Sequence, residues 1–476
     1  MRLPIRVLAI AAPAAMLIPI CGFAHDPAGA PAVDFIVTAA PVYRPLAALR
    51  GEERFPGGAQ LLLVHAGKAE PLVPGFASTA DANVFFDGDM VLFAGKKTAS
   101  DPWQIWEMSL KDRTGDRSLR QVISTAADAE RPLYLPGGRM VWAERTATGF
   151  QLDSAEDGHP STAVHGPLNP TAGPGVLALT YMRASAFPAD VLADGRILFE
   201  AGFPLGSGST PEMYLIYADG SGVESYRCDH GRARWGGRQL ASGDVVFTQG
   251  RSLARFTSPL AHEVPVAAPR GEYAGAIAET AGGDWLVSVR AEASAHYAIK
   301  LWKSGAASMQ TVLERNGEDL VEPVLVAARA TPKRHPSGLH SWNYANLLAL
   351  DARLSREGDL KTAPASVRLE MLDAQGRAVV NGTAPVEADG SFFVQTPADR
   401  PIRFALLDKK GAVLRREQGW FWIRGGEQRI CVGCHTGPER GSENRVPAVL
   451  LRTTAPADLT GTRATAGLEI GMPESK

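Results

Sequence analysis

The chain has 476 residues, and its 49 basic and 51 acidic residues give a net charge of −2 at pH 7. A chain of this length exceeds one ordinary hydrophobic core, so we expect two or three domains. Because no long run of one charge sign is present, the sequence excludes the electrostatic footprint of nucleic-acid or anionic-membrane binding. The 49 glycines and 34 prolines favour a turn-rich β protein.

The first 24 residues have the pattern of a secretory signal peptide. Arg2 and Arg6 form a basic start, which an apolar stretch over residues 7–20 follows. Gly22 and Ala24 then place small residues at the positions that cleavage after Ala24 requires. A transmembrane anchor is the alternative, but the apolar stretch is short and contains prolines. We therefore expect a periplasmic or otherwise exported protein that has no membrane span after signal cleavage.

From residue 34 to about residue 330 the sequence repeats a glycine-containing turn followed at once by a hydrophobic strand. Short strands separated by glycine turns, recurring roughly every 40–55 residues, are typical of propeller blades. Since a lone blade cannot bury both faces of its sheet, we expect the repeats to close into a ring. A long β-sandwich is the alternative. The pattern predicts a six-bladed β-propeller, with the six hydrophobic strands at residues 61–64, 90–93, 140–142, 197–199, 245–247 and 285–287.

Beyond the propeller the sequence predicts a linker, a second domain and a tail. Residues 331–365 are the predicted linker, because Thr331–Gly338 combines proline, glycine and basic residues. Residues 366–415 alternate between polar and apolar positions among Asp/Gly turns, which predicts a small β-sandwich. Residues 416–454 form a separate segment, and residues 455–476 lack hydrophobic periodicity and are expected to be a mobile tail.

Residues 431–435 read Cys-Val-Gly-Cys-His, the spacing of a c-type haem attachment motif. The thiols of Cys431 and Cys434 can reach both vinyl groups of a haem, and His435 can ligate the iron from the proximal side. A zinc site would need a further ligand, a thioredoxin-like pair would need a following helix in a βαβ unit, and a plain disulfide is the third alternative. The histidine directly after the second cysteine, in an exported chain, favours one covalent haem c.

Aromatic and basic side chains surround this motif. The rings of residues 420–422 could line a porphyrin or fill the core of the sandwich. Arg424, Arg429 and Arg440 could pair with haem propionates, or lie on a solvated surface. The predicted haem-binding segment is therefore residues 416–454.

Short motifs between residues 385 and 450 carry a resemblance to a known family. They are Asp389-Gly390-Ser391-Phe392, Pro397-Ala398-Asp399-Arg400-Pro401, Leu407-Asp408, Gly426-Glu427-Gln428-Arg429, the haem motif and Asn444-Arg445-Val446-Pro447. Together they resemble the middle domain of the hydrazine synthase alpha subunit and its relatives. The resemblance implies a six-bladed TolB-like propeller joined to a domain that carries a c-type haem.

The resemblance also implies a role for Cys228. In hydrazine synthase alpha a propeller cysteine helps bind zinc next to the haem, and Cys228 is the residue that matches it. Asp229 and His230 follow it directly and are potential ligands of the same zinc ion. The alternative is that Cys228 is a small residue packed between blades.

The chain also departs from the synthase subunit. It has one haem motif, whereas the synthase has a further haem domain. The synthase uses a tyrosine shortly after its motif as the iron ligand of its catalytic haem, but the last tyrosine of this chain is Tyr344. We therefore expect an activity other than hydrazine synthesis.

Three functions fit these features. The first is a haem-dependent oxidoreductase acting on a small molecule, with its haem facing the propeller. The second is a monohaem electron-transfer cytochrome whose propeller docks a redox partner protein, and the third is a structural or sensing propeller. An enzyme keeps the sixth iron position open, whereas a relay fills it. Ligands for that position could come from His340, His335, His230, Met371 or Met472.

Overall fold

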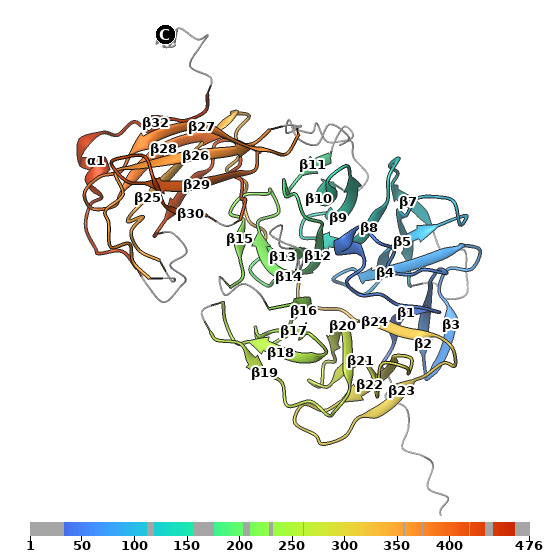
Figure 1. The fold of residues 1–476 in the computed structure, drawn as a ribbon. Helices are drawn as coiled ribbons and strands as arrows, with labels where there is room; N and C mark the ends of the chain where they lie inside the picture. The colour runs from blue at the N-terminus through green and yellow to red at the C-terminus, as the bar shows by residue number, and fades with distance from the viewer. Residues whose placement is uncertain are drawn as a thin grey trace, which may run out of the picture.

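The computed structural model describes residues 33–111, 119–156, 176–202, 210–227, 232–259, 261–355, 358–373, 375–417, 419–433 and 441–461. These residues are nearly all β (Figure 1), apart from the 3₁₀ helix η1 (Ala48–Arg50) and the short helix α1 (Ala448–Arg452). Over the same residues, no helix has the length and apolar character that crossing a membrane requires.

The first domain consists of six four-stranded antiparallel sheets, counted over the described residues. Within each sheet the strands follow one another from the centre of the ring outward. They are β24 (Asp319–Leu325), β1 (Phe35–Ala40), β2 (Gln60–His65), β3 (Lys68–Pro71); β4 (Ser78–Val84), β5 (Met90–Lys96), β6 (Gln104–Ser109), β7 (Arg120–Ile123); β8 (Ala129–Leu135), β9 (Arg139–Thr146), β10 (Gly149–Glu156), β11 (Val176–Ala178); β12 (Ala186–Val191), β13 (Ile197–Gly202), β14 (Pro211–Ile216), β15 (Glu224–Ser225); β16 (Arg234–Gln239), β17 (Val245–Gln249), β18 (Ser252–Phe256), β19 (Val264–Pro265); and β20 (Glu272–Glu279), β21 (Trp285–Arg290), β22 (Ala298–Trp302), β23 (Gln310–Leu313).

The sheets close into a ring. The inner strands β24, β4, β8, β12, β16 and β20 contact one another in that order and back to β24. Strand β24 pairs antiparallel with β1, placing Phe35 opposite Leu325 and Ala40 opposite Asp319. One sheet thus combines the first and last strands of the domain, which is how a propeller ring is sealed (Figure 1).

The predicted turn–strand units occupy two different positions in the sheets. Five of them are second strands, namely β5, β9, β13, β17 and β21. The first unit is β2, which is the third strand of its sheet. The second strand of that sheet is β1, which the glycine-turn pattern did not predict. Because β1 is paired with the distant β24, no turn from an inner strand precedes it. This explains why the first two units lie so close in the sequence.

The second domain is a β-sandwich of two four-stranded sheets. Their strand orders are β31 (Gln428–Cys431), β25 (Tyr344–Ala349), β28 (Phe392–Pro397), β32 (Ala457–Asp458); and β27 (Ala378–Pro385), β26 (Ser366–Leu372), β29 (Ile402–Leu407), β30 (Val413–Arg416). Leu347, Leu369, Val394 and Phe404 from both sheets form its core. The predicted all-β class, a propeller followed by a small sandwich, is confirmed.

The sandwich extends beyond its predicted bounds. Strand β25 lies inside the predicted linker 331–365, where burial alternates along Tyr344–Ala349 after the prolines and glycine have ended. Strand β31 comes from the predicted haem-binding segment, and β32 from the predicted tail. Short strands of two to six residues, paired with distant partners, leave little periodicity for a sequence to show.

Candidate functional site

The haem-attachment motif begins where strand β31 ends. Strand β31 runs parallel to β25 at the edge of the sandwich, with Cys431 opposite Ala349. The structure therefore fixes the first cysteine of the motif on a paired strand. Cys434, His435 and Arg440 lie outside the described residues.

The thiol of Cys431 shares one face of β31 with Arg429, because side chains two residues apart in a strand point the same way. Cys431 is half-buried and packs against the sandwich core, whereas Ile430 on the other face is 65% exposed. Burial raises the pKa of the Cys431 thiol, which the guanidinium of Arg429 partly offsets. The thiol is thus neutral at pH 7.

This face of β31 is turned toward the propeller. Arg429 donates to the carbonyl oxygen of Val223, in the hairpin that joins β14 and β15, and to that of Trp422 at 3.4 Å. The Glu427 carboxylate accepts from the backbone N–H of Gly222 in the same hairpin at 3.3 Å. Glu427 and Arg429, which precede the motif, therefore hold the start of β31 against the fourth sheet of the ring.

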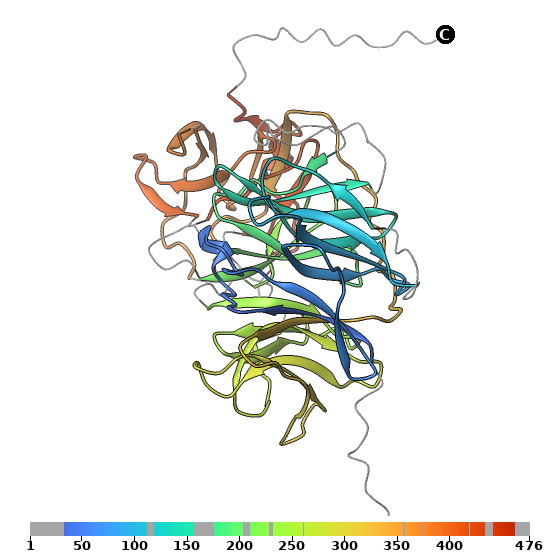
Figure 2. The ribbon, with the colours of Figure 1, turned by 90° about the vertical axis from the view of Figure 1, so that its right-hand side faces the viewer.

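Arg424 and Trp422 also belong to the joint between the domains. Figures 1 and 2 show the sandwich lying beside the propeller at this joint. Arg424 is 3% exposed and donates to the carbonyl oxygen of Ala178 at 2.9 Å and to the Tyr181 hydroxyl at 2.6 Å. Its Nη1 also lies 3.2 Å from Asp399 Oδ1. Arg424 is therefore neither a haem-propionate partner nor a solvated residue, because its contacts within the interface fully enclose it.

The three aromatic residues before the motif lie in three different environments. Trp422 is 1% exposed and belongs to a core cluster of the propeller, with its ring centroid 6.1 Å from that of Tyr181. Phe421 packs on the sandwich core, and the guanidinium of Arg403 lies 4.3 Å from the ring centroid of Trp420. The sequence could not distinguish these environments, because neighbouring residues in an extended chain point in opposite directions.

Glu417 is a titratable group on the same side as Cys431. Burial raises the pKa of Glu417 to about 7, and the backbone N–H of Phe404, at 3.3 Å from Oε2, and the nearby Arg429 only partly oppose this. Glu417 contributes to the raised pKa of the Cys431 thiol. A carboxyl that titrates near neutrality beside the motif was missed from the sequence, because its burial comes from strands far away in the chain.

The candidates for the sixth iron ligand lie in different places. The His335 ring stacks on Tyr217 with centroids 4.0 Å apart, at the propeller hairpin that also contacts Glu427. His340 stacks on Trp342 at 4.6 Å and lies against Gly426, at the opposite end of the β25–β31 pair from Cys431. Both histidines therefore lie near the start of β31, His335 against the propeller hairpin and His340 against Gly426.

Met371 takes no part in this arrangement, and the remaining candidates lie outside the part of the chain that the structure describes. Met371 packs on the sandwich core from strand β26. His230 and Met472 lie outside the described residues, as do the other proposed zinc ligands, Cys228 and Asp229. Among the residues that the structure describes, no group of three or more His, Cys, Asp or Glu side chains could hold a metal ion.

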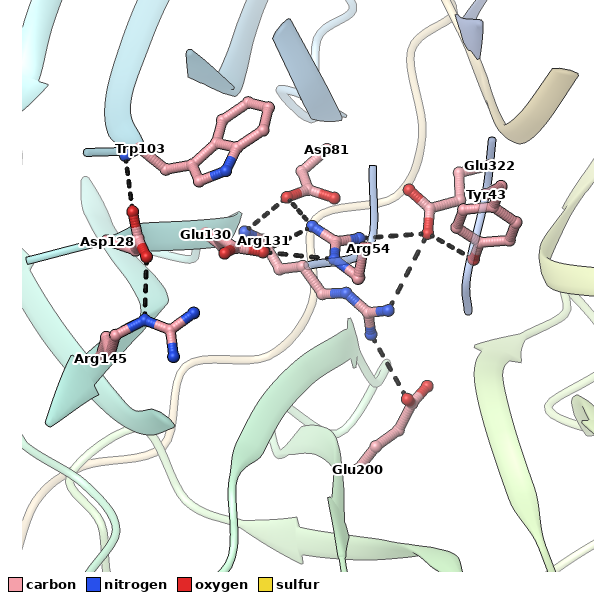
Figure 3. Close-up of polar contacts among 10 residues, drawn as sticks. All are labelled: Tyr43, Arg54, Asp81, Trp103, Asp128, Glu130, Arg131, Arg145, Glu200 and Glu322. Carbon is pink, nitrogen blue, oxygen red and sulfur yellow. Dashed lines mark hydrogen bonds and ion pairs between the residues drawn. The ribbon is translucent and has the colours of Figure 1, made fainter. Parts of the chain in front are cut away.

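A second polar site, which the sequence pattern did not predict, fills the centre of the propeller (Figure 3). Arg54, from the connection between β1 and β2, donates to Asp81 Oδ2 at 2.6 Å and to Glu130 Oε2 at 2.9 Å. Its Nη1 lies 3.5 Å from Glu322 Oε1, which also accepts from the Tyr43 hydroxyl at 3.1 Å. These contacts join three sheets of the ring through one guanidinium.

Arg131 extends this central cluster to a fourth sheet. Its Nη1 donates to Glu200 Oε2 on β13 at 3.3 Å, and its backbone N–H donates to Asp81 Oδ2 at 3.0 Å. The backbone N–H of Gly236 on β16 donates to the other Glu200 oxygen. The side chains of the cluster are separated by up to 279 residues in the chain, so no local sequence motif could predict it.

Burial and charge set opposite pKa shifts within the cluster. Burial would raise the pKa of Asp81, but Arg54 and Arg131 together outweigh it and the pKa is lowered. Burial raises the pKa of Glu130 and of Glu322 despite the guanidinium of Arg54. The cluster therefore contains more carboxyl groups than guanidinium groups to pair with them.

Comparison with known proteins places the sequence similarity in the second domain. Residues 355–436 match the model of the hydrazine synthase alpha subunit middle domain. Hydrazine synthase subunit alpha of Kuenenia stuttgartiensis is 37% identical over 67 residues, which are 14% of this chain and 8% of that protein. The matched region is thus a small part of that relative's own length.

The structural similarity extends much further. The structure of Kuenenia stuttgartiensis hydrazine synthase superposes with a TM-score of 0.71 at 18% sequence identity, covering 89% of this chain and 71% of that one. This match shows a shared fold across both domains. In the sequence of its second domain and in its overall fold, the chain resembles the hydrazine synthase alpha subunit-like family, as the motifs around the Cys431 motif predicted.

Proposed function

We propose that this chain is an exported c-type haem protein, and that it acts as a haem-dependent oxidoreductase on a small molecule, with its haem facing the propeller. The observation that carries the proposal is the position of Cys431 on the face of β31 that Arg429 fastens to the propeller. Cys434 and His435 complete the motif in the sequence. The family resemblance supports a redox function and leaves the substrate open.

The residues around Cys431 fit a covalently bound haem. The thiol is half-buried at the end of an edge strand, so it is held in place with one side open to an incoming group. Arg429 offers a cation beside it, and Phe421 an apolar ring, 5.5 Å from that guanidinium. When bound, the haem would supply a one-electron redox centre whose iron can take a small ligand.

The chain's own residues would position this centre and supply a proton. Arg424, Glu427 and Arg429 fasten the segment before the motif to the propeller, which fixes the direction in which the motif faces. Because the pKa of Glu417 is raised to about 7, its carboxyl can hold or release a proton near neutral pH.

The first test is haem attachment. Protein matured in a host with c-haem assembly should keep its haem under denaturing conditions, and Cys431→Ala or Cys434→Ala should weaken or abolish attachment. Ser258→Ala, which changes a residue far from the motif in the chain, serves as the control for expression and denaturation. Denatured protein without haem-linked mass would refute the proposal, and an intact Met1 on functional protein would refute export.

An electron-transfer cytochrome, with a redox protein as partner, is the second candidate, and the position of His335 favours it. If His335 fills the sixth iron position, the reduced spectrum will not change with carbon monoxide, and His335→Ala will make it respond. If the position is open, carbon monoxide shifts the spectrum of the unaltered protein. The second result supports the enzyme, and the first supports the electron carrier.

Zinc beside the haem is also a proposal. Val223, whose carbonyl oxygen accepts from Arg429, is five residues before Cys228, but the residues between them run back along β14, where the N–H of Tyr226 donates to the carbonyl oxygen of Met213. The proposal therefore rests on the family resemblance, with Asp229 and His230 as further ligands. Metal analysis should find one zinc per chain, lost in Cys228→Ser. Absence of zinc would leave Cys228 as a packing residue.

A further inference from the structure

A cavity of about 60 Å³ lies at the centre of the ring, beside the charged cluster of Arg54. One buried water needs roughly 10–15 Å³ on this measure, so the space admits about four to six water-sized atoms. Its wall includes residues from all six inner strands, among them Asp81, Arg131, Gly236 and Glu322. The cavity is thus a feature of the closed ring rather than of any one sheet.

The inner strands are distorted at the level of the cavity. Asp81, Arg131 and Glu322 have φ angles of 59°, 50° and 56°, in the left-handed region that side chains other than glycine rarely adopt. At each of them the pairing with the next strand shifts register. Such backbone strain is energetically unfavourable and is concentrated at functional sites.

The charges around the cavity do not balance. Four carboxylates, those of Asp81, Glu130, Glu200 and Glu322, are joined in one hydrogen-bonded cluster with only two guanidinium groups. With every group ionised the cluster carries a charge of −2. Buried charges without partners are strongly unfavourable, so the cluster either keeps carboxyl groups protonated, as the raised pKa values of Glu130 and Glu322 favour, or gains a further cation.

An unsatisfied acceptor identifies where that charge would bind. The Asp81 side chain is 3% exposed and lines the cavity, and its Oδ1 is buried without any hydrogen-bond partner. Its other oxygen is occupied by Arg54 and by the backbone of Arg131. In Figure 3 this free oxygen lies on the side of Asp81 that faces Glu322. A buried acceptor of this kind calls for a donor from a ligand.

We propose that the central cavity binds a small planar cation of the guanidinium or amidinium class. Such a group has about four heavy atoms, which matches the space, and it carries several N–H donors in one plane for the oxygens of Asp81, Glu200 and Glu322. The cluster already uses two guanidinium groups, Arg54 and Arg131, in the same way. A bare metal ion fits less well, because no three metal-ligating side chains converge among the described residues.

The test uses the full chain and equilibrium dialysis with methylguanidine or acetamidine as probes. Saturable binding of one equivalent is expected, with little binding of tetramethylammonium, which has the charge but no N–H donors. Glu200→Gln keeps the shape of the side chain and its bond to Gly236, and should weaken binding about ten- to a hundredfold. Glu314→Gln, an exposed residue with the same change of charge, should bind as the unaltered chain does.

Three results would overturn the proposal. They are no saturable binding to folded protein, equal binding of tetramethylammonium, and unchanged affinity in Glu200→Gln. If Glu200→Gln does not fold, Ala276→Val provides the alternative, because it narrows the cavity without changing any charge. This variant should lose methylguanidine binding and keep its circular dichroism spectrum, and retained binding would count against the site.

Discussion

Two of the buried arginines, one inside the propeller and one between the domains, differ in how well their charge is matched. Arg54, inside the propeller, faces Asp81, Glu130 and Glu322. Arg424, between the domains, faces one carboxylate and otherwise a carbonyl and a hydroxyl group, and its Nε has no partner.

The pKa values of the paired carboxyl groups show the same difference. In the ring, Arg54 and Arg131 together lower the pKa of Asp81, although burial raises those of Glu130 and Glu322. At the joint, burial prevails over Arg424 and raises the pKa of Asp399. The ring is therefore held by strong charge pairing, and the joint between domains by shape and neutral hydrogen bonds. The two domains should accordingly differ in how they come apart.

Removing the arginine of the ring should have the largest effect. Arg54→Met leaves Asp81 and Glu130 buried without their main cation and should cost about 3–5 kcal/mol of unfolding free energy. Urea denaturation followed by tryptophan fluorescence measures it. Adding Glu130→Gln should restore part of the loss, and a loss below about 1 kcal/mol would contradict the charge-matching argument.

Removing Arg424, the arginine at the joint between the domains, should reduce the unfolding free energy by less. Arg424→Met leaves the Ala178 carbonyl and the Tyr181 hydroxyl without a donor, which predicts a loss of about 1–3 kcal/mol. The loss should appear as faster protease cleavage between residues 331 and 343, with the propeller's own unfolding unchanged. Equal destabilisation of both domains would show that they unfold as one unit.

A third, smaller effect is expected in the pH dependence of stability, and it comes from Glu417 in the sandwich. The folded pKa of Glu417 is raised to about 7, so folding favours its protonated form and stability falls as pH rises from about 4.5 through 7. Glu417→Gln should remove this slope and gain about 1–2 kcal/mol above pH 7, discounted for partial exposure. Thermal unfolding at several pH values checks it, and an unaltered slope would exclude Glu417 as its cause.

An exposed contact between the domains should matter least. Arg183 donates to the carbonyl oxygen of Gly376 at 2.5 Å, but its side chain is open to solvent. Arg183→Ala should change stability by about 0–0.5 kcal/mol, against the larger effect of Arg424→Met in the same assay. A loss as large as that of Arg424→Met would place the main joint at Arg183 instead.

The second strands of the propeller could be predicted from the sequence, but its inner strands could not. Units such as Asp87-Gly88 before Met90–Phe93 combine a turn with an apolar strand, and both signals are local. The inner strands carry polar residues beside proline, as in Arg131-Pro132 and Glu322-Pro323, which normally argues against a central strand. The prolines are accommodated because these strands bulge there, and a recurring charged residue before proline was the available signal.

The candidate haem site was predictable only in its covalent part. Cys431, Cys434 and His435 form a motif with a fixed spacing, whereas the contacts of Arg424 and Arg429 depend on residues about 200 positions away. The central cluster is equally remote from local pattern, since Arg54 and Glu322 meet only after the ring closes. Long-range pairing of isolated charged residues leaves no periodic trace in a sequence.

The pairing of β1 with β24 also sets an order of events during synthesis. Strand β1 has to wait for residues 319–325 before it gains its inner neighbour, so almost the whole propeller must be synthesised before the ring can close. Glu322 is therefore the last of the central carboxylates to reach Arg54. Because the ring closes late, a ligand of the central cavity has time to bind before closure.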